Sequence, residues 1–353
     1  NNLFTLCHLI YTDTFYMKRK WIRWVSWILL TPIILFVILM VLLYVPPVQN
    51  LLRREVTAYA SKVTGMQIQV ERIDLRFPLN LLVRGVEVIQ QPDTLLSLES
   101  LNVRVQAWPL IKGKVEVDEV TLSRVAVNSA DLMEGMKIKG VLGRFFLQSH
   151  GVDLSNELAV INQVELSDTH MQLLMNDTTT TPKDTTASAP INWKVALHQL
   201  KLKNVSFSMQ LPADSMRMTA HIGEAAINNA QADLKNQYYD LKKFLLSGTS
   251  ASYDTGTAQP TEGFDASHIA VRDIRIALDS LLYKGRDMNA VIREFTMNER
   301  SGLSVTALTG RAYSNDSVIC VPSLKLNTPH SEIDLSAHTY WELVNIPTTG
   351  RLS

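Results

Sequence analysis

The stretch 115–128, VEVDEVTLSRVAVN, spaces its apolar residues two, three, two, three and two positions apart. An α-helix would repeat them every three or four residues and a flat strand every two, so neither template fits. The same spacing returns in VALHQLKLKNVSFSM, residues 195–209. A change from two to three turns the next side chains to the other face of a sheet unless the strand bulges or turns a corner. Each gap of three therefore predicts a bend in a strand.

Most of the chain after Gly65 follows this short alternation, including LSLESLNVRV (96–105) and IAVRDIRIAL (269–278). Turn residues separate the runs, as expected for consecutive strands. The sequence thus predicts a mainly β fold. If every gap of three bends a strand, the apolar residues on both sides of the gap line one face of a curved sheet.

Two segments rich in Thr, Ser, Pro and Gly interrupt the alternation, at 176–190 and 247–263. Such a composition supplies too few apolar side chains for a packed core, so we predict two disordered loops. The loops divide the β region into three blocks, 66–175, 191–246 and a truncated 264–353. A helix is predicted over 230–244, at the end of the middle block.

A long uncharged segment precedes the β region. Residues 24–45 are apolar almost throughout, and as a helix they would measure about 33 Å, enough to cross a hydrocarbon core. Trp24, Trp27 and Tyr44 mark its ends as interfacial anchors. Basic residues within 18–23 place the amino end in the cytoplasm by the positive-inside tendency. We predict a single transmembrane helix over 21–45, with the cytoplasmic segment 1–20 before it and the remainder exported.

Two alternatives to this anchor are a cleaved signal peptide and a buried helix of a soluble protein. A signal peptide has a shorter apolar region followed closely by small residues, and the only such site here is at 58–60.

The chain begins at Asn1 and ends in NIPTTGRLS. We therefore expect a fragment or an overextended reading frame, in which Met17 is the natural start and residues 1–16 are not native.

A second helix is predicted over 46–65. Its apolar residues recur at helical spacing, and Gly65 offers a stop. The amphipathic pattern fits a helix lying near the membrane, and equally a helix that caps the β domain.

Composition and motifs exclude several function classes. The 34 basic residues balance the 34 acidic ones, and no basic cluster predicts nucleic-acid binding. Two distant cysteines support neither a disulfide framework nor a cysteine zinc site. No nucleophile elbow, phosphate loop, zinc-protease motif or dinucleotide fingerprint occurs, so we expect no enzyme, cofactor or metal. An anchored hydrolase would need His150 and Asp153 to converge with a nucleophile.

The order of features resembles the amino-terminal part of the TamB and AsmA-like family of bacterial envelope proteins, of Bacteroidetes type. The resemblance covers 21–128, with AWPLIKGKVEVDEVTL (107–122) as its most specific motif. It implies an inner-membrane anchor and an elongated periplasmic β-sheet with an apolar groove, the β-taco. It also implies phospholipid transport between membranes, outer-membrane protein assembly, or both. Family members are longer, and a carboxyl-terminal region absent here would meet an outer-membrane barrel protein.

The expected partners are therefore the membrane and phospholipid acyl chains, because acyl chains can cover an apolar sheet face that no second layer buries. The alternative is a structural or protein-binding envelope scaffold, in which the same residues form an ordinary closed β core. The predicted lining residues are Leu98, Leu101, Val103, Val105, Val115, Val117, Val120, Leu122, Val125, Val127, Val195, Leu197, Leu200, Leu202, Val205 and Phe207.

Overall fold

In the described part of the chain, one long helix is followed by a run of strands. The computed structural model describes residues 45–76, 79–90, 93–106, 108–109, 116–129, 135–153, 157–175 and 192–341. Its main elements are α2 (Pro46–Thr64), β1 (Gln67–Arg76), β2 (Asn80–Gln90), β3 (Asp93–Val105), β4 (Val117–Asn128), β5 (Met136–Asp153), β6 (Leu158–Met175), β7 (Lys194–Leu211), β8 (Met216–Asp233), β9 (Tyr238–Asp254), β10 (His268–Lys284), β11 (Asp287–Glu299), β12 (Ser304–Val305), β13 (Ala307–Ser314), β14 (Val318–Asn327) and β15 (Glu332–Tyr340).

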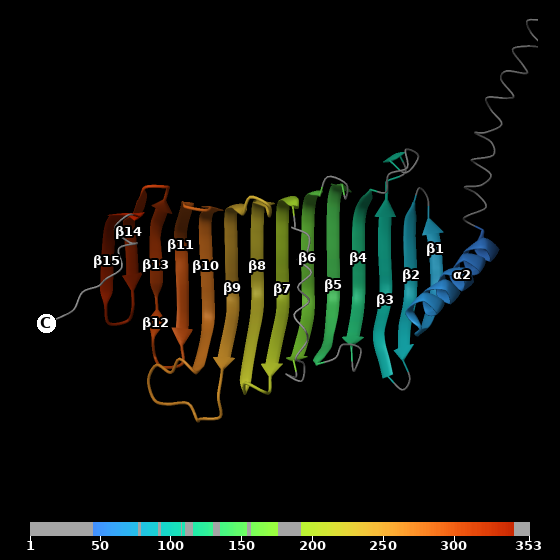
Figure 1. Ribbon diagram of the computed structural model, residues 1–353, viewed down its shortest axis with the longest axis horizontal. Helices are drawn as coiled ribbons and strands as arrows, with labels where there is room; N and C mark the ends of the chain where they lie inside the picture. The colour runs from blue at the N-terminus through green and yellow to red at the C-terminus, as the bar shows by residue number, and fades with distance from the viewer. Residues whose placement is uncertain are drawn as a thin grey trace, which may run out of the picture.

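All the strands belong to a single 15-stranded sheet, and they lie side by side in sequence order (Figure 1). Neighbouring strands are antiparallel except β6 and β7, which run parallel. The short β12 pairs with β11 beside the main path. β1 and β15 form the two edges, so the sheet is open, and the prediction of a mainly β fold is confirmed.

Helix α2 confirms the helix predicted over 46–65. It begins at Pro46 and ends at Gly65, which takes a left-handed conformation with φ +70°. In the described part of the chain, no helix combines the length and apolarity needed to span a membrane. The predicted transmembrane helix 21–45 lies outside the described residues apart from Val45.

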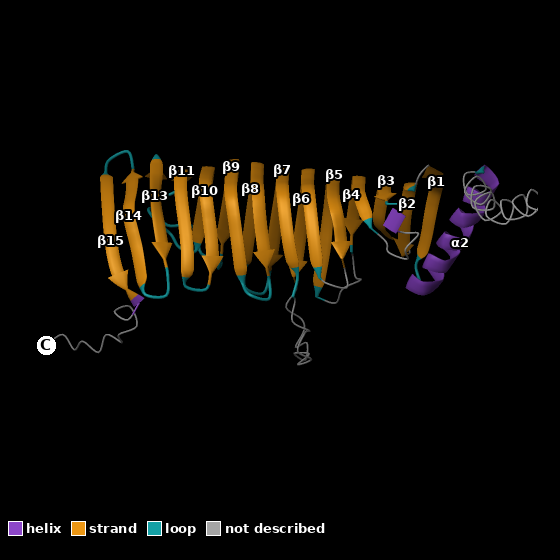
Figure 2. Cartoon of the chain, turned by 90° about the horizontal axis from the view of Figure 1, so that it is seen from above, coloured by secondary structure: helices purple, strands orange, loops and turns teal. Residues whose placement is uncertain are grey.

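Helix α2 lies beside the free edge of β1 (Figure 2). Gln49 Nε2 donates to the carbonyl of Leu75 at 3.2 Å, and Arg53 Nη1 donates to the carbonyl of Glu71 at 2.7 Å. The hydroxyl of Ser61 accepts the N–H of Ile68 at 3.1 Å. These bonds satisfy backbone groups that an edge strand would otherwise leave open to pairing. The helix therefore caps the domain, as one of the two interpretations of its sequence required.

A bend line crosses the sheet from β2 to β10, through one gap of three in each strand. In six of these strands the gap holds a left-handed residue, with φ between +46° and +58°. Asn, Asp and Gly adopt this conformation more readily than other residues, and they fill all but one of the positions. The six residues are Gly85, Arg124, Asp168, Asn204, Gly248 and Asp273.

A second bend line crosses the gaps on the other side of the strand centres. The gap 117–120 coincides with a register shift between β3 and β4. The gap 197–200 faces Asn229 of β8, a left-handed residue with φ +55°. Strands such as β4 and β7 are therefore bent twice, which explains why their spacing alternates between two and three.

The bends curl the sheet toward its apolar face. Within a gap, two consecutive side chains point to the polar face. In the first bend line, Glu99 from the gap of β3 and Arg124 from the gap of β4 form an exposed ion pair on that face. The outer side of a bend has the longer path and accommodates the extra residue. The apolar face is thus concave, and we call the resulting shape the trough: a floor between the two bend lines and a wall on each side.

The trough has only one layer. Among the described residues no side chain falls below 2 % exposure, and the buried apolar residues are few. Contacts between elements join strands adjacent in the sheet and join α2 to β1, with only weak exceptions. Within the described part of the chain, neither a second sheet nor a helix layer covers the concave face (Figures 1 and 2).

Two sequence-based boundaries differ from the structure. The predicted loop 247–263 begins too early, because Ser247–Asp254 still belongs to β9 and pairs with β8. Ser250 and Ser252 lie on the polar face, where Ser252 and Thr219 hydrogen-bond at 2.7 Å. The helix predicted over 230–244 is wrong, since those residues form the β8–β9 hairpin. The predicted loop 176–190 lies outside the described residues.

Candidate functional site

The two faces of the sheet differ sharply in chemistry. Between β7 and β8, every cross-strand pair on the concave face is apolar, whereas the convex face carries pairs such as Lys203–Glu224 and Ser208–Thr219. The concave pairs are Val195–Ala232, Leu197–Ala230, Leu200–Ile227, Leu202–Ala225, Val205–Ile222, Phe207–Ala220, Met209–Met218 and Leu211–Met216. Because the bends restore the facing of the side chains, β7 keeps its lining residues on one face across both gaps of three.

One row of paired residues crosses the floor of the trough from edge to edge. Each member is the direct cross-strand partner of the next, in all fourteen strands of the main path. The row consists of Leu75, Leu81, Val103, Val120, Leu147, Val164, Leu200, Ile227, Phe244, Leu278, Ile292, Gly310, Leu324 and Leu335. With strands about 4.8 Å apart, thirteen spacings give an apolar strip roughly 60 Å long.

The register brings the predicted lining residues onto this face. On β3 and β4 they pair with one another, in the pairs Leu98–Val125, Leu101–Leu122, Val103–Val120 and Val105–Val117. Val127 pairs with Leu96 of β3. The candidates on β7, from Val195 to Phe207, lie between apolar partners on β6 and β8, except that Val205 faces Thr169 of β6. Phe145 and Leu166 connect the two groups, because they pair in turn with Leu122 and Leu202.

Several side chains on the concave face remain open to solvent. Phe207 is 42 % exposed and Tyr239 is 42 % exposed, and most other lining residues are half-buried between their neighbours. An apolar surface of this extent is unfavourable in water unless something covers it. Four predicted residues lie outside the described part of the chain and have no place in this geometry: Val115, Trp24, Trp27 and Tyr44.

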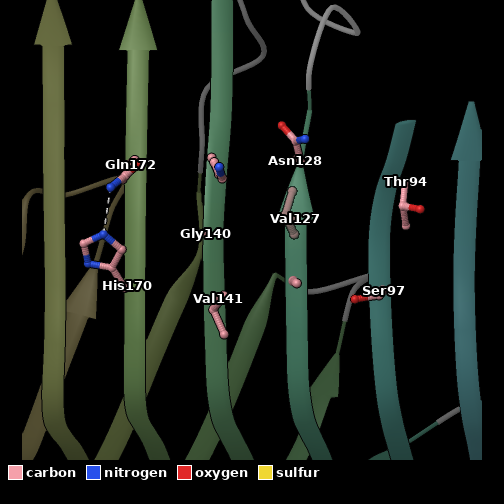
Figure 3. Close-up of a pocket in the computed structure, with 10 residues that line it drawn as sticks. Thr94, Ser97, Val127, Asn128, Gly140, Val141, His170 and Gln172 are labelled. Carbon is pink, nitrogen blue, oxygen red and sulfur yellow. Dashed lines mark hydrogen bonds between the residues drawn. The ribbon is translucent and has the colours of Figure 1, made fainter. Parts of the chain in front are cut away.

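The convex face carries the charges. Ion pairs such as Arg104–Glu119 (3.0 Å) and Lys201–Glu165 (3.7 Å) link neighbouring strands there. A shallow depression of about 430 Å³ also lies on this side, near the ends of β3 to β6 (Figure 3). His170 and Gln172 line it, with their Nε2 atoms 2.9 Å apart. Its mixed lining and open form contrast with the continuous apolar strip, so we place the functional site on the concave face.

His150 and Asp153, the residues that a hydrolase would need, both lie on β5. His150 is exposed, and its Nδ1 atom lies 2.5 Å from Nδ2 of Asn162. Asp153 pairs with Leu158 at the end of β5. Within the described part of the chain, no three His, Cys, Asp or Glu side chains are grouped to hold a metal ion.

The clearest pKa change belongs to a loop rather than to the trough. Asp265 accepts the N–H of Thr261 at 3.1 Å and the N–H of Ser267 at 2.9 Å, and His268 Nδ1 lies 2.9 Å from its carboxylate. These partners stabilise the charged form and lower the pKa of Asp265 to about 2. The arrangement orders the connection from β9 to β10, where it has a structural role.

The sequence-based list omitted lining residues on β5, β6, β8, β9 and β10. Phe145, Leu166, Ile227, Phe244 and Leu278 all pair into the concave face. The same spacing of two and three was present in IAVRDIRIAL and identifies the β10 residue. Comparison with protein-family models and with curated proteins finds no match, so the resemblance of residues 21–128 to TamB and AsmA-like proteins stays a prediction.

Proposed function

We propose that this protein carries phospholipid acyl chains along the trough. It acts as an inner-membrane-anchored periplasmic β protein in phospholipid transport between membranes, in outer-membrane assembly, or in both. The observation that supports this proposal is the apolar row that runs across fourteen strands without a covering layer in the described residues.

Acyl chains match this surface in chemistry and in shape. Each methylene transferred from water to an apolar surface contributes about 0.8 kcal/mol, so ten methylenes contribute roughly 8 kcal/mol before any opposing term. The strip is long, narrow and free of charge along the row from Leu75 to Leu335. A phospholipid could keep its headgroup at the open side of the trough while its chains lie on the floor. Such binding requires no covalent catalysis.

Position 200 offers a direct test, because Leu200 lies in the floor row and the adjacent Gln199 faces outward. A photoreactive amino acid is placed at either position in the full chain, which is irradiated in its native membrane. We expect crosslinks to phospholipid at 200 and none at 199. Crosslinks at 200 to protein alone would support the scaffold alternative and contradict the lipid conduit.

The matched pair Leu200→Asp and Gln199→Asp provides a second measurement. Both variants add the same carboxylate, but only the first puts an uncompensated charge on the lipid-facing floor, which is unfavourable by several kcal/mol. Phospholipid that copurifies with each variant in mild detergent is extracted and quantified by mass spectrometry. We expect its loss in Leu200→Asp alone; equal retention in both variants would contradict the proposal. Lipid held by the membrane anchor contributes equally to the amount measured in the two variants.

A further inference from the structure

Helix α2 contacts the sheet through polar side chains. A helix packed on a core would instead face it with apolar side chains. The side that faces β1 uses Gln49, Arg53 and Ser61 for hydrogen bonds to the strand edge. Four apolar side chains of the helix are exposed to solvent. Leu51 is 58 % exposed, Val56 46 %, Tyr59 71 % and Val63 66 %.

Three of these residues, Val56, Tyr59 and Val63, form one surface, which we call the α2 stripe. Val56, Tyr59 and Val63 recur at spacings of three and four, so they line one side of the helix. Leu51 lies about 80° from Tyr59 around the helix axis and about 20° from Ala58, so it is not part of the stripe. Basic residues flank the stripe, since the helix carries Arg53, Arg54 and Lys62 against a single acidic residue, Glu55.

We propose that the α2 stripe lies in the surface of a lipid bilayer, with the β1 edge of the sheet held at the membrane. A helix that binds in the interfacial plane buries an apolar side and keeps basic residues at headgroup level, which is the arrangement found here. The bilayer is also within reach: α2 begins directly after the uncharged apolar segment 24–45, and no residue of this 19-residue helix lies more than about 28 Å from its start.

The placement gives the trough a direction. Because α2 lies along β1, the floor row starts at the bilayer surface with Leu75 and leads away from it toward β15. An acyl chain leaving the membrane beside α2 would meet the apolar face at once. This proposal rests on the membrane anchor of the proposed function but not on lipid in the trough, because the α2 stripe is a separate surface.

Spin labels on the full chain test the proposal. In a background with Cys7 and Cys320 replaced by serine, a nitroxide is attached at Tyr59→Cys or Val63→Cys, and at Ala58→Cys as the control. Ala58 is exposed and adjacent to Tyr59 but lies off the stripe. The chain is reconstituted in vesicles of phosphatidylethanolamine and phosphatidylglycerol, and the fraction that floats with the vesicles is examined for collision with oxygen and with a water-soluble nickel complex.

We expect the ratio of oxygen to nickel accessibility to be severalfold higher at 59 and 63 than at 58. An equal ratio at all three positions would place the stripe in water and overturn the proposal. Low accessibility to both reagents at 59 and 63 would show a protein partner or a second copy on the stripe, and would also overturn it. The same holds if the chain does not float with vesicles. Crosslinking at position 200 reports separately on lipid in the trough.

Discussion

Asn204 provides a quantitative test of how the bends are made. Its backbone is left-handed, with φ +53°, and its Nδ2 atom donates to Oδ1 of Asp168 at 2.8 Å across the parallel pair β6–β7. Glycine at this position keeps the bend and loses only the hydrogen bond of an exposed side chain, about 1 kcal/mol. Valine loses the same bond and must also hold a conformation that disfavours β-branched residues, which adds about 2 kcal/mol. Asn204→Val should therefore be less stable than Asn204→Gly by about 2 kcal/mol.

Hydrogen exchange measured by mass spectrometry on the full chain in detergent can resolve this difference locally. Opening of β6 to β8 should become roughly 30-fold more frequent in Asn204→Val than in Asn204→Gly. Ser206→Val is the control, because Ser206 lies two positions along β7, hydrogen-bonds His221 at 3.0 Å and lacks the positive φ. Equal exchange in the two Asn204 variants, or the same acceleration in Ser206→Val, would refute the reasoning that a left-handed residue fixes the bend.

Two further predictions concern a close approach and a titrating loop. A side chain at Gly223 would place its Cβ 2.8 Å from the carbonyl oxygen of Gly248, so Gly223→Ala should destabilise β8–β9 by about 1–3 kcal/mol in thermal unfolding. The folded-state pKa of Asp265 is lowered to about 2, so its stabilisation is complete above pH 4 and is lost as the pH falls toward 2. Pepsin should then cleave the loop 255–267 faster in wild type as the pH falls through this range, but not in Asp265→Asn.

The β class and the lining could be predicted because burial on one face imposes a period on the sequence. In strand β7 the apolar residues from Val195 to Phe207 are spaced by this rule alone. The bends themselves also leave a local signature, an apolar residue followed by one polar residue, then Asn, Asp or Gly, then the next lining residue. LKNV at 202–205, VRDI at 271–274 and VRGV at 83–86 all follow it. Reading this signature along the chain would have located the first bend line.

Two features were beyond a local pattern. Composition predicted a loop over 247–263, but Ser250 and Ser252 belong to β9, because hydroxyl residues are acceptable on a solvent-facing side of a strand. The parallel pairing of β6 with β7 could not be predicted from the apolar spacing, which does not distinguish parallel from antiparallel neighbours. Likewise, the side of α2 that faces β1 follows from hydrogen bonds to an edge that only the folded sheet provides.

The bend signature lies within each strand. The bends therefore determine the cross-section of the trough, whereas the number of strands determines its length. Adding or removing one hairpin with the same two gaps would change the trough by about 10 Å while leaving its cross-section unaltered. The α2 helix occupies the β1 edge through its hydrogen bonds, so such changes are easiest to accommodate away from it. Evolution can therefore change the length of the trough by adding or removing whole hairpins, without changing its cross-section.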